Sequence, residues 1–73
     1  MEGGRRELET LLEYLVKHNE DHAGEIMDLA TRAQAMGKTE ARGHLVRGVD
    51  LLKDSNEELK AALAALGGRD VSG

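Results

Sequence analysis

The feature that most constrains this chain is a pair of leucine-rich stripes with helical spacing, separated by one short break. The first stripe alternates steps of four and three residues through Leu8, Leu12, Leu15, Asn19, His22, Ile26, Leu29, Ala33 and Met36. The second runs through Ala41, Leu45, Gly48 or Val49, Leu52, Asn56, Leu59, Leu63 and Leu66. This spacing gathers apolar side chains along one side of an α-helix, so it predicts two amphipathic helices.

Charged residues, glycine and threonine predict where these helices begin and end. Acidic Glu7 and Glu9 favour the positive end of the first helix, and Gly37 suits the left-handed conformation that ends many helices. Thr39 is a favourable N-cap for the second helix. One domain, 1–73, is thus predicted to comprise a helix at about 5–36, a turn at 37–38, a helix at about 39–66 and flexible ends at 1–4 and 69–73.

So short a connection makes the two helices antiparallel neighbours, which predicts an all-α fold, an antiparallel two-helix hairpin. A chain of 73 residues without cysteine has no disulfide to supplement a small core, so oligomerisation or a metal must do so. Further apolar residues widen the stripes beyond what one partner helix covers: Leu11, Val46, Leu51 and Ala62. We therefore expect a homodimer that forms a four-helix bundle, with a different protein partner as the alternative.

The histidines at positions 18 and 22 are the sequence feature closest to a chemical motif. Because His18 and His22 are four residues apart, a helix stacks them on one side with Cβ atoms about 5 to 6 Å apart. Imidazole pairs with this spacing can chelate Zn, Ni or Cu. Glu25 lies on the same side and is the candidate third ligand, so Zn and Ni are the candidate cofactors.

A second interpretation of the same region needs no metal. Folding the chain at Gly37 brings His22 near Asn56, and with Asn19 these residues would form a polar layer within the apolar seam. A hydrogen-bonded polar layer sets register and oligomeric state in coiled coils. The residues leave both interpretations open, while His44, near the turn, is expected to be a surface residue.

Charge and missing motifs exclude several classes of function. The net charge of −4 is spread along the chain without a basic block, which disfavours nucleic-acid binding. Glu7, Glu9 and Glu13 interrupt the first apolar stretch, so we expect neither a signal peptide nor a membrane span, and a cytoplasmic protein. Without a phosphate-binding glycine loop or a nucleophile motif, we expect a binding or assembly module and not an enzyme.

Two short segments, one on either side of the Gly37 turn, are distinctive in this sequence. They are LLEYLVKHNEDH at 11–22 and NEEL at 56–59. Together with the turn they resemble small uncharacterised bacterial and archaeal helical-hairpin domains with an HN-x-x-H signature, and the resemblance extends over about 8–66. It implies a hairpin domain of unknown function whose distinctive positions are His18, Asn19 and His22.

Overall fold

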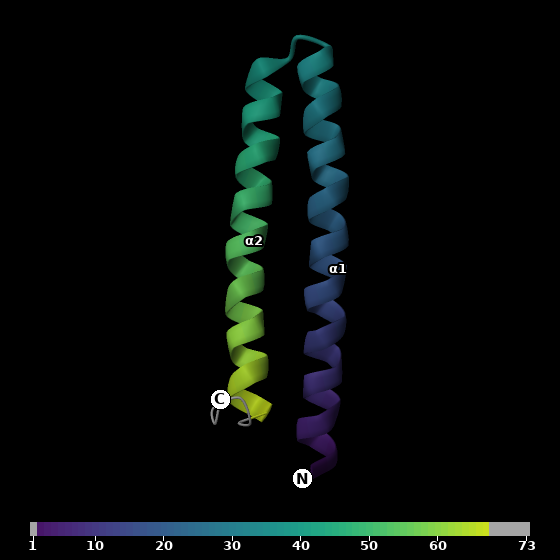
Figure 1. The fold of residues 1–73 in the computed structure, drawn as a ribbon, viewed down its shortest axis with the longest axis vertical. Coiled ribbons are helices and arrows are strands. Elements are labelled where there is room, and N and C mark those ends of the chain that lie inside the picture. Colours follow the sequence, from purple (N-terminus) through teal and green to yellow (C-terminus); the bar gives the residue numbers. More distant parts are fainter. Residues whose placement is uncertain (1, 68–73) are drawn as a thin grey trace.

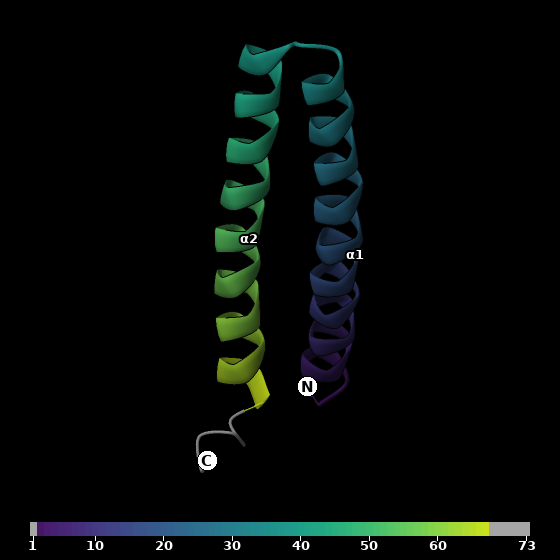
Figure 2. The same ribbon diagram turned by 45° about the horizontal axis from the view of Figure 1, so that its top comes forward.

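The computed structural model describes residues 2–67, and side chains from residue 4 onward. Two helices, α1 (Glu2–Ala35) and α2 (Thr39–Gly67), make up this part of the chain, with no strand. They run antiparallel, side by side along most of their length (Figures 1 and 2). The predicted helical hairpin is thus the observed fold. Neither helix within residues 2–67 has the length and apolarity needed to cross a membrane.

Gly37 ends α1 by adopting a backbone conformation that other residues avoid. Its φ is 75°, in the left-handed region. The Lys38 N–H donates to the Ala33 carbonyl at 2.9 Å, and the Gly37 N–H donates to the Gln34 carbonyl at 3.0 Å. These two bonds form a Schellman motif, which satisfies carbonyls that the end of the helix would otherwise leave unpaired.

The helix boundaries differ slightly from those predicted. The Lys38 carbonyl accepts the first hydrogen bond of α2, from the Arg42 N–H at 3.0 Å, so Lys38 occupies the N-cap position expected for Thr39. Residues 2–4, expected to be flexible, are helical. Glycine costs only about 1 kcal/mol relative to alanine within a helix, so the glycines at positions 3 and 4 do not prevent the helix from extending to residue 2. Residue 1 and the predicted flexible end at 69–73 lie outside the described residues.

The two helices meet along a seam whose residues alternate in steps of four and three. On α2 the seam is the predicted stripe without its first residue, Ala41, which is exposed. On α1 the predicted stripe and the seam coincide only at alternate positions: Leu12, Asn19, Ile26 and Ala33. Between them, the seam residue is the one that follows the predicted residue in the sequence. The buried or half-buried seam residues are Leu12, Val16, Asn19, Ala23, Ile26, Ala30 and Ala33 on α1, and Leu45, Val49, Leu52, Asn56, Leu59, Leu63 and Leu66 on α2.

The seam buries little apolar surface. Among the residues whose side chains are described, only Ala23, Ala30, Val49 and the polar Asn56 are buried. Two of the three apolar ones are alanines, which allow helices to approach closely but contribute little area. A core of this size is at the lower limit of what stabilises a small domain.

Candidate functional site

An outer apolar face lies beside the seam. We define it by six exposed large apolar residues: Leu8, Leu11, Leu15, Leu29, Met36 and Leu51. Three of those on α1, Leu11, Leu15 and Leu29, each immediately precede a seam residue. Leu51 on α2 likewise precedes Leu52 and is 68% exposed.

The residues of the outer apolar face on α1 and α2 point to the same side of the hairpin. Two antiparallel helices packed along one seam are related by an approximate two-fold axis perpendicular to both. Equivalent positions, such as the one just before each seam residue, therefore face the same side on both helices. The hairpin thus leaves Leu11, Leu15, Leu29 and Leu51 exposed on one side.

His18 and His22 also precede seam residues, so they lie on this side, in the middle of α1. The Nε2 atoms of the two rings face each other at 2.9 Å. The rings are nearly perpendicular, with centroids 4.3 Å apart. The ring of Tyr14 stacks on His18 at a centroid distance of 5.4 Å, one turn earlier in α1. Tyr14, His18 and His22, on three consecutive turns of α1, therefore form one contiguous cluster of rings.

Glu25 determines which nitrogen of His22 carries hydrogen. Its Oε1 lies 3.0 Å from Nδ1 of His22, and a carboxylate can only accept, so Nδ1 is the protonated nitrogen. The Nε2 of a neutral His22 then carries a lone pair and accepts the hydrogen bond that Nε2 of His18 donates. Glu25 thus orients the His22 ring so that its free lone pair points at His18.

As a metal site, one chain is incomplete. The structure brings His18, His22 and Glu25 together, but Glu25 contacts the edge of the His22 ring opposite the facing Nε2 atoms. Within the described part of the chain, no group of three or more His, Cys, Asp or Glu residues is arranged to hold a metal ion. A single hairpin therefore brings together two imidazole nitrogens and not the predicted set of three ligands.

Asn19 and Asn56 form a polar bridge inside the seam. The Asn19 amide donates to Oδ1 of Asn56 at 3.0 Å. The Asn56 amide donates to the Val16 carbonyl at 3.1 Å. Asn56 is buried, and none of the described buried side-chain polar atoms lacks a partner. This bridge joins α1 to α2 at one level and opposes sliding of one helix along the other.

His22, predicted to belong to this polar layer, lies outside it. Its side chain is 48% exposed, and the neighbouring Ala23 takes the seam position. Folding the sequence at Gly37 predicts that Asn56 lies opposite His22. In the structure Asn56 lies opposite Asn19, three residues earlier in α1. His44, as expected, is exposed near the turn, with Nδ1 3.0 Å from a guanidinium nitrogen of Arg47.

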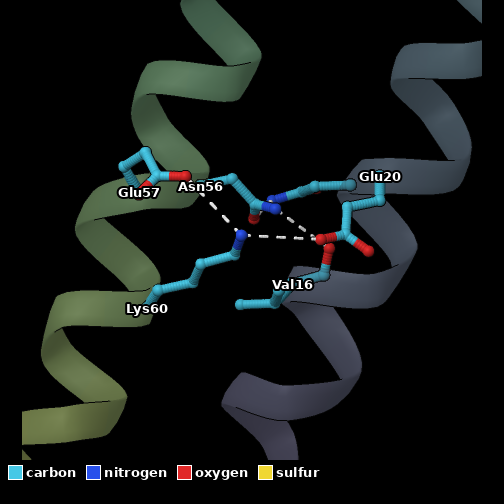
Figure 3. Close-up of polar contacts among 6 residues, drawn as sticks. Val16, Glu20, Asn56, Glu57 and Lys60 are labelled. Carbon is cyan, nitrogen blue, oxygen red and sulfur yellow. Dashed lines mark hydrogen bonds and ion pairs between the residues drawn. The ribbon is translucent and has the colours of Figure 1, made fainter.

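The opposite side of the hairpin is more polar. Lys60 pairs there with Glu20 of α1 at 3.7 Å and with Glu57 at 3.5 Å, as Figure 3 shows. A shallow hollow nearby is lined mainly by Asn19, Glu20, Ala23, Gly24, Met27, Leu52, Lys53 and Asn56. Charged groups at its edges and its shallow form make it a weaker candidate site than the outer apolar face.

Residues 8–66 match the family described as Domain of unknown function (DUF8180). The chain belongs to this family. No curated protein and no solved structure matches it. The DUF8180 match begins at Leu8 and ends at Leu66, so it contains the turn, the asparagine bridge and the histidine pair.

Two features of this DUF8180 hairpin were not predicted from its sequence. One is the stacking of Tyr14 on His18, which the four-residue spacing of two aromatic rings on a helix could have indicated. The other is the division of the α1 apolar residues into a seam and a separate outer apolar face. The two sets have the same helical spacing and alternate along α1, as Leu11 and Leu12 do, so periodicity alone does not separate them.

Proposed function

We propose that this DUF8180 hairpin is an assembly module that associates with a second copy of itself through the outer apolar face to form a four-helix bundle. The observation that carries the proposal is the position of the large apolar residues: leucines lie on the outer apolar face, while alanines fill much of the α1 seam. Clustered exposed large apolar residues mark interaction surfaces. In this proposal the module binds and does not catalyse.

The order of residues along α1 supports a second copy as the occupant. Leu15 and Leu29 lie seven residues on either side of His22, and Leu8 and Met36 lie fourteen residues on either side. A two-fold axis through His22 would therefore pair Leu15 with the second copy's Leu29, and Leu8 with its Met36, in antiparallel α1 helices. A self-complementary surface of this kind is what a two-fold dimer requires.

Charge supports the same arrangement. In that register the beginning of one α1 lies beside the turn region of the other, so Glu7 comes within one position of Lys38. Opposite charges at the edge of an interface favour the correct orientation and disfavour others.

A pair of charge substitutions tests the proposal by sedimentation velocity. Leu15 and Met27 are 42% and 41% exposed, but Leu15 belongs to the outer apolar face and Met27 to the opposite side. Leu15→Glu should raise the dimer dissociation constant by about a hundredfold or more, because each copy would bury an unpaired carboxylate. Met27→Glu should leave the dissociation constant within about threefold of the wild-type value.

The outcomes separate clearly. A Leu15→Glu chain that sediments as a monomer, helical or unfolded, beside a dimeric Met27→Glu chain supports the proposal. A wild-type chain that is monomeric, or two variants that dimerise equally well, would contradict it.

A second candidate function is transition-metal binding, and the facing Nε2 atoms of His18 and His22 favour it. Ligand binding to the folded state alone raises its stability, so Zn²⁺ or Ni²⁺ should raise the melting temperature. The substitution His22→Gln should abolish the increase while preserving helicity. An equal increase in the wild-type chain and in the variant would exclude this histidine pair as the site.

A further inference from the structure

We infer that the histidine pair is half of a metal site and that the second half comes from a second copy of the chain. One zinc-class divalent ion would be held by four imidazoles, from His18 and His22 of each copy. The inference rests on the proposed dimer, because a lone hairpin supplies only two of the four ligands.

The ligand count within one chain leads to this inference. Zinc and its borderline-soft neighbours prefer three or four protein ligands, with imidazole nitrogen among the best. The described residues of one hairpin provide two facing nitrogens and no third group arranged with them. The remaining ligands must come from outside the chain, and the identical pair on a second copy has the required chemistry.

The position of the pair points to the same conclusion. His18 and His22 lie on the outer apolar face, with Leu15 one turn to one side and Leu29 two turns to the other. A two-fold axis that crosses α1 between His18 and His22, about half a turn from the centre of the self-complementary stripe, brings the two histidine pairs together. The four imidazoles would then gather in the interior of the bundle, where surrounding leucines exclude competing water.

The geometry of the pair is close to that of a chelate. Zn–N bonds of about 2.0 to 2.1 Å at tetrahedral angles place two ligand nitrogens about 3.3 to 3.4 Å apart. The Nε2 atoms of His18 and His22 are 2.9 Å apart. A separation of about half an ångström, within the freedom of two exposed rings, and transfer of the His18 proton from Nε2 to Nδ1 through solvent convert the imidazole hydrogen bond into a chelate.

Two neighbouring residues act as positioning residues. Glu25 accepts from Nδ1 of His22 at 3.0 Å, the arrangement by which a carboxylate behind a metal-binding histidine orients its ring. Tyr14 stacks on the His18 ring at an interplanar angle of 14° and restricts its rotation. The imidazoles are therefore held by contacts that leave both Nε2 atoms directed at one point.

Native mass spectrometry of the full chain, titrated with Zn²⁺ alone, tests the inference. We expect one zinc ion per two chains, and a dimer dissociation constant at least tenfold lower with zinc than with a chelator. His18→Gln and His22→Gln should each lose the bound zinc while the dimer persists without metal. Glutamine has good helix propensity, so circular dichroism should show both variants to be helical.

Two further variants complete the experiment. His44→Gln is the matched control, because His44 is an exposed histidine outside the pair, and it should retain one zinc ion per dimer. Glu25→Gln should keep this stoichiometry but bind zinc about tenfold more weakly, as expected for a positioning residue.

The possible results separate the metal site from the dimer. One zinc ion per single chain, or zinc retained in both His18→Gln and His22→Gln, would overturn the shared site. A metal-free dimer that takes up no zinc would overturn the site and leave the assembly proposal intact. A chain that is monomeric with and without zinc would overturn both.

Discussion

Two adjacent residues of α1, Leu29 and Ala30, show a difference between two regions of the hairpin, the outer apolar face and the seam. Ala30 faces α2 and is 2% exposed, whereas the larger Leu29 is 47% exposed on the outer apolar face. A helix that contacted only α2 would gain more from leucine in the seam, because buried area sets the hydrophobic contribution. In the proposed dimer, the seam serves close approach of two helices, while the largest apolar groups contact the second copy.

Truncating Leu29 should give the largest effect on stability and separates the two regions most sharply. In the proposed dimer this side chain is covered by the second copy, so Leu29→Ala should lower the free energy of unfolding by about 2 kcal/mol or more per chain. Urea denaturation at fixed chain concentration measures the change. Met27→Ala, on the opposite side, is the control and should change stability by less than about 0.5 kcal/mol. Equal small effects at both positions would mean that nothing covers Leu29.

Enlarging its neighbour tests the seam. Ala30→Leu should cost about 2 kcal/mol, because three additional carbons have no space between closely packed helices. The same urea experiment measures this loss. A more stable Ala30→Leu chain would show that the seam holds room for larger side chains, and it would remove the distinction between the two regions.

The asparagine bridge should contribute less to stability than Leu29 or Ala30, and its main effect should be to fix the alignment of α1 with α2. Asn56→Ala should cost about 1 to 2 kcal/mol, because it leaves the Asn19 amide without its partner in a half-buried site. Replacing both asparagines by leucine should restore or exceed wild-type stability. Loss of a single alignment of the helices, seen as broadened amide signals in NMR spectra, should accompany that gain. Sharp wild-type-like spectra from the double variant would contradict a role in register.

Lys60 should have the smallest effect. Its amine pairs with Glu20 of the other helix, but the side chains are 45% and 55% exposed, so water screens the pair. Lys60→Ala should lower stability by less than about 1 kcal/mol, and less still at high salt. A larger loss in urea denaturation would indicate that the polar side of the hairpin is also buried in the assembly.

The two helices also differ in how far the sequence predicted them. The seam of α2 agrees with its predicted stripe from Leu45 to Leu66, because on that helix large apolar residues concentrate on one side. On α1 the prediction chose Leu15 and Leu29, and the structure places Val16 and Ala30 in the seam instead. Periodicity weighs residues by hydrophobicity, and it cannot indicate that alanine occupies the contact between the two helices while leucine lies exposed beside it.

The candidate site was predicted in composition but not in arrangement. The four-residue spacing of His18 and His22 was sufficient to place their rings together. The partners of Asn56 and Glu25 depended on the seam alignment and on side-chain rotamers, which a linear sequence does not specify. The sequence alone therefore places His22 in the polar layer that Asn19 occupies and gives Glu25 a ligand role, whereas Glu25 contacts the other edge of the His22 ring.

The most direct test of the central claim is a dilution series of the wild-type chain, followed together by sedimentation equilibrium and circular dichroism. If a second copy covers the outer apolar face, the mass at micromolar concentration should be twice that of one chain, and helicity should decline as dilution separates the copies. A fully helical single chain throughout the series would contradict the claim, because it would show that the leucines of α1 need no second contact.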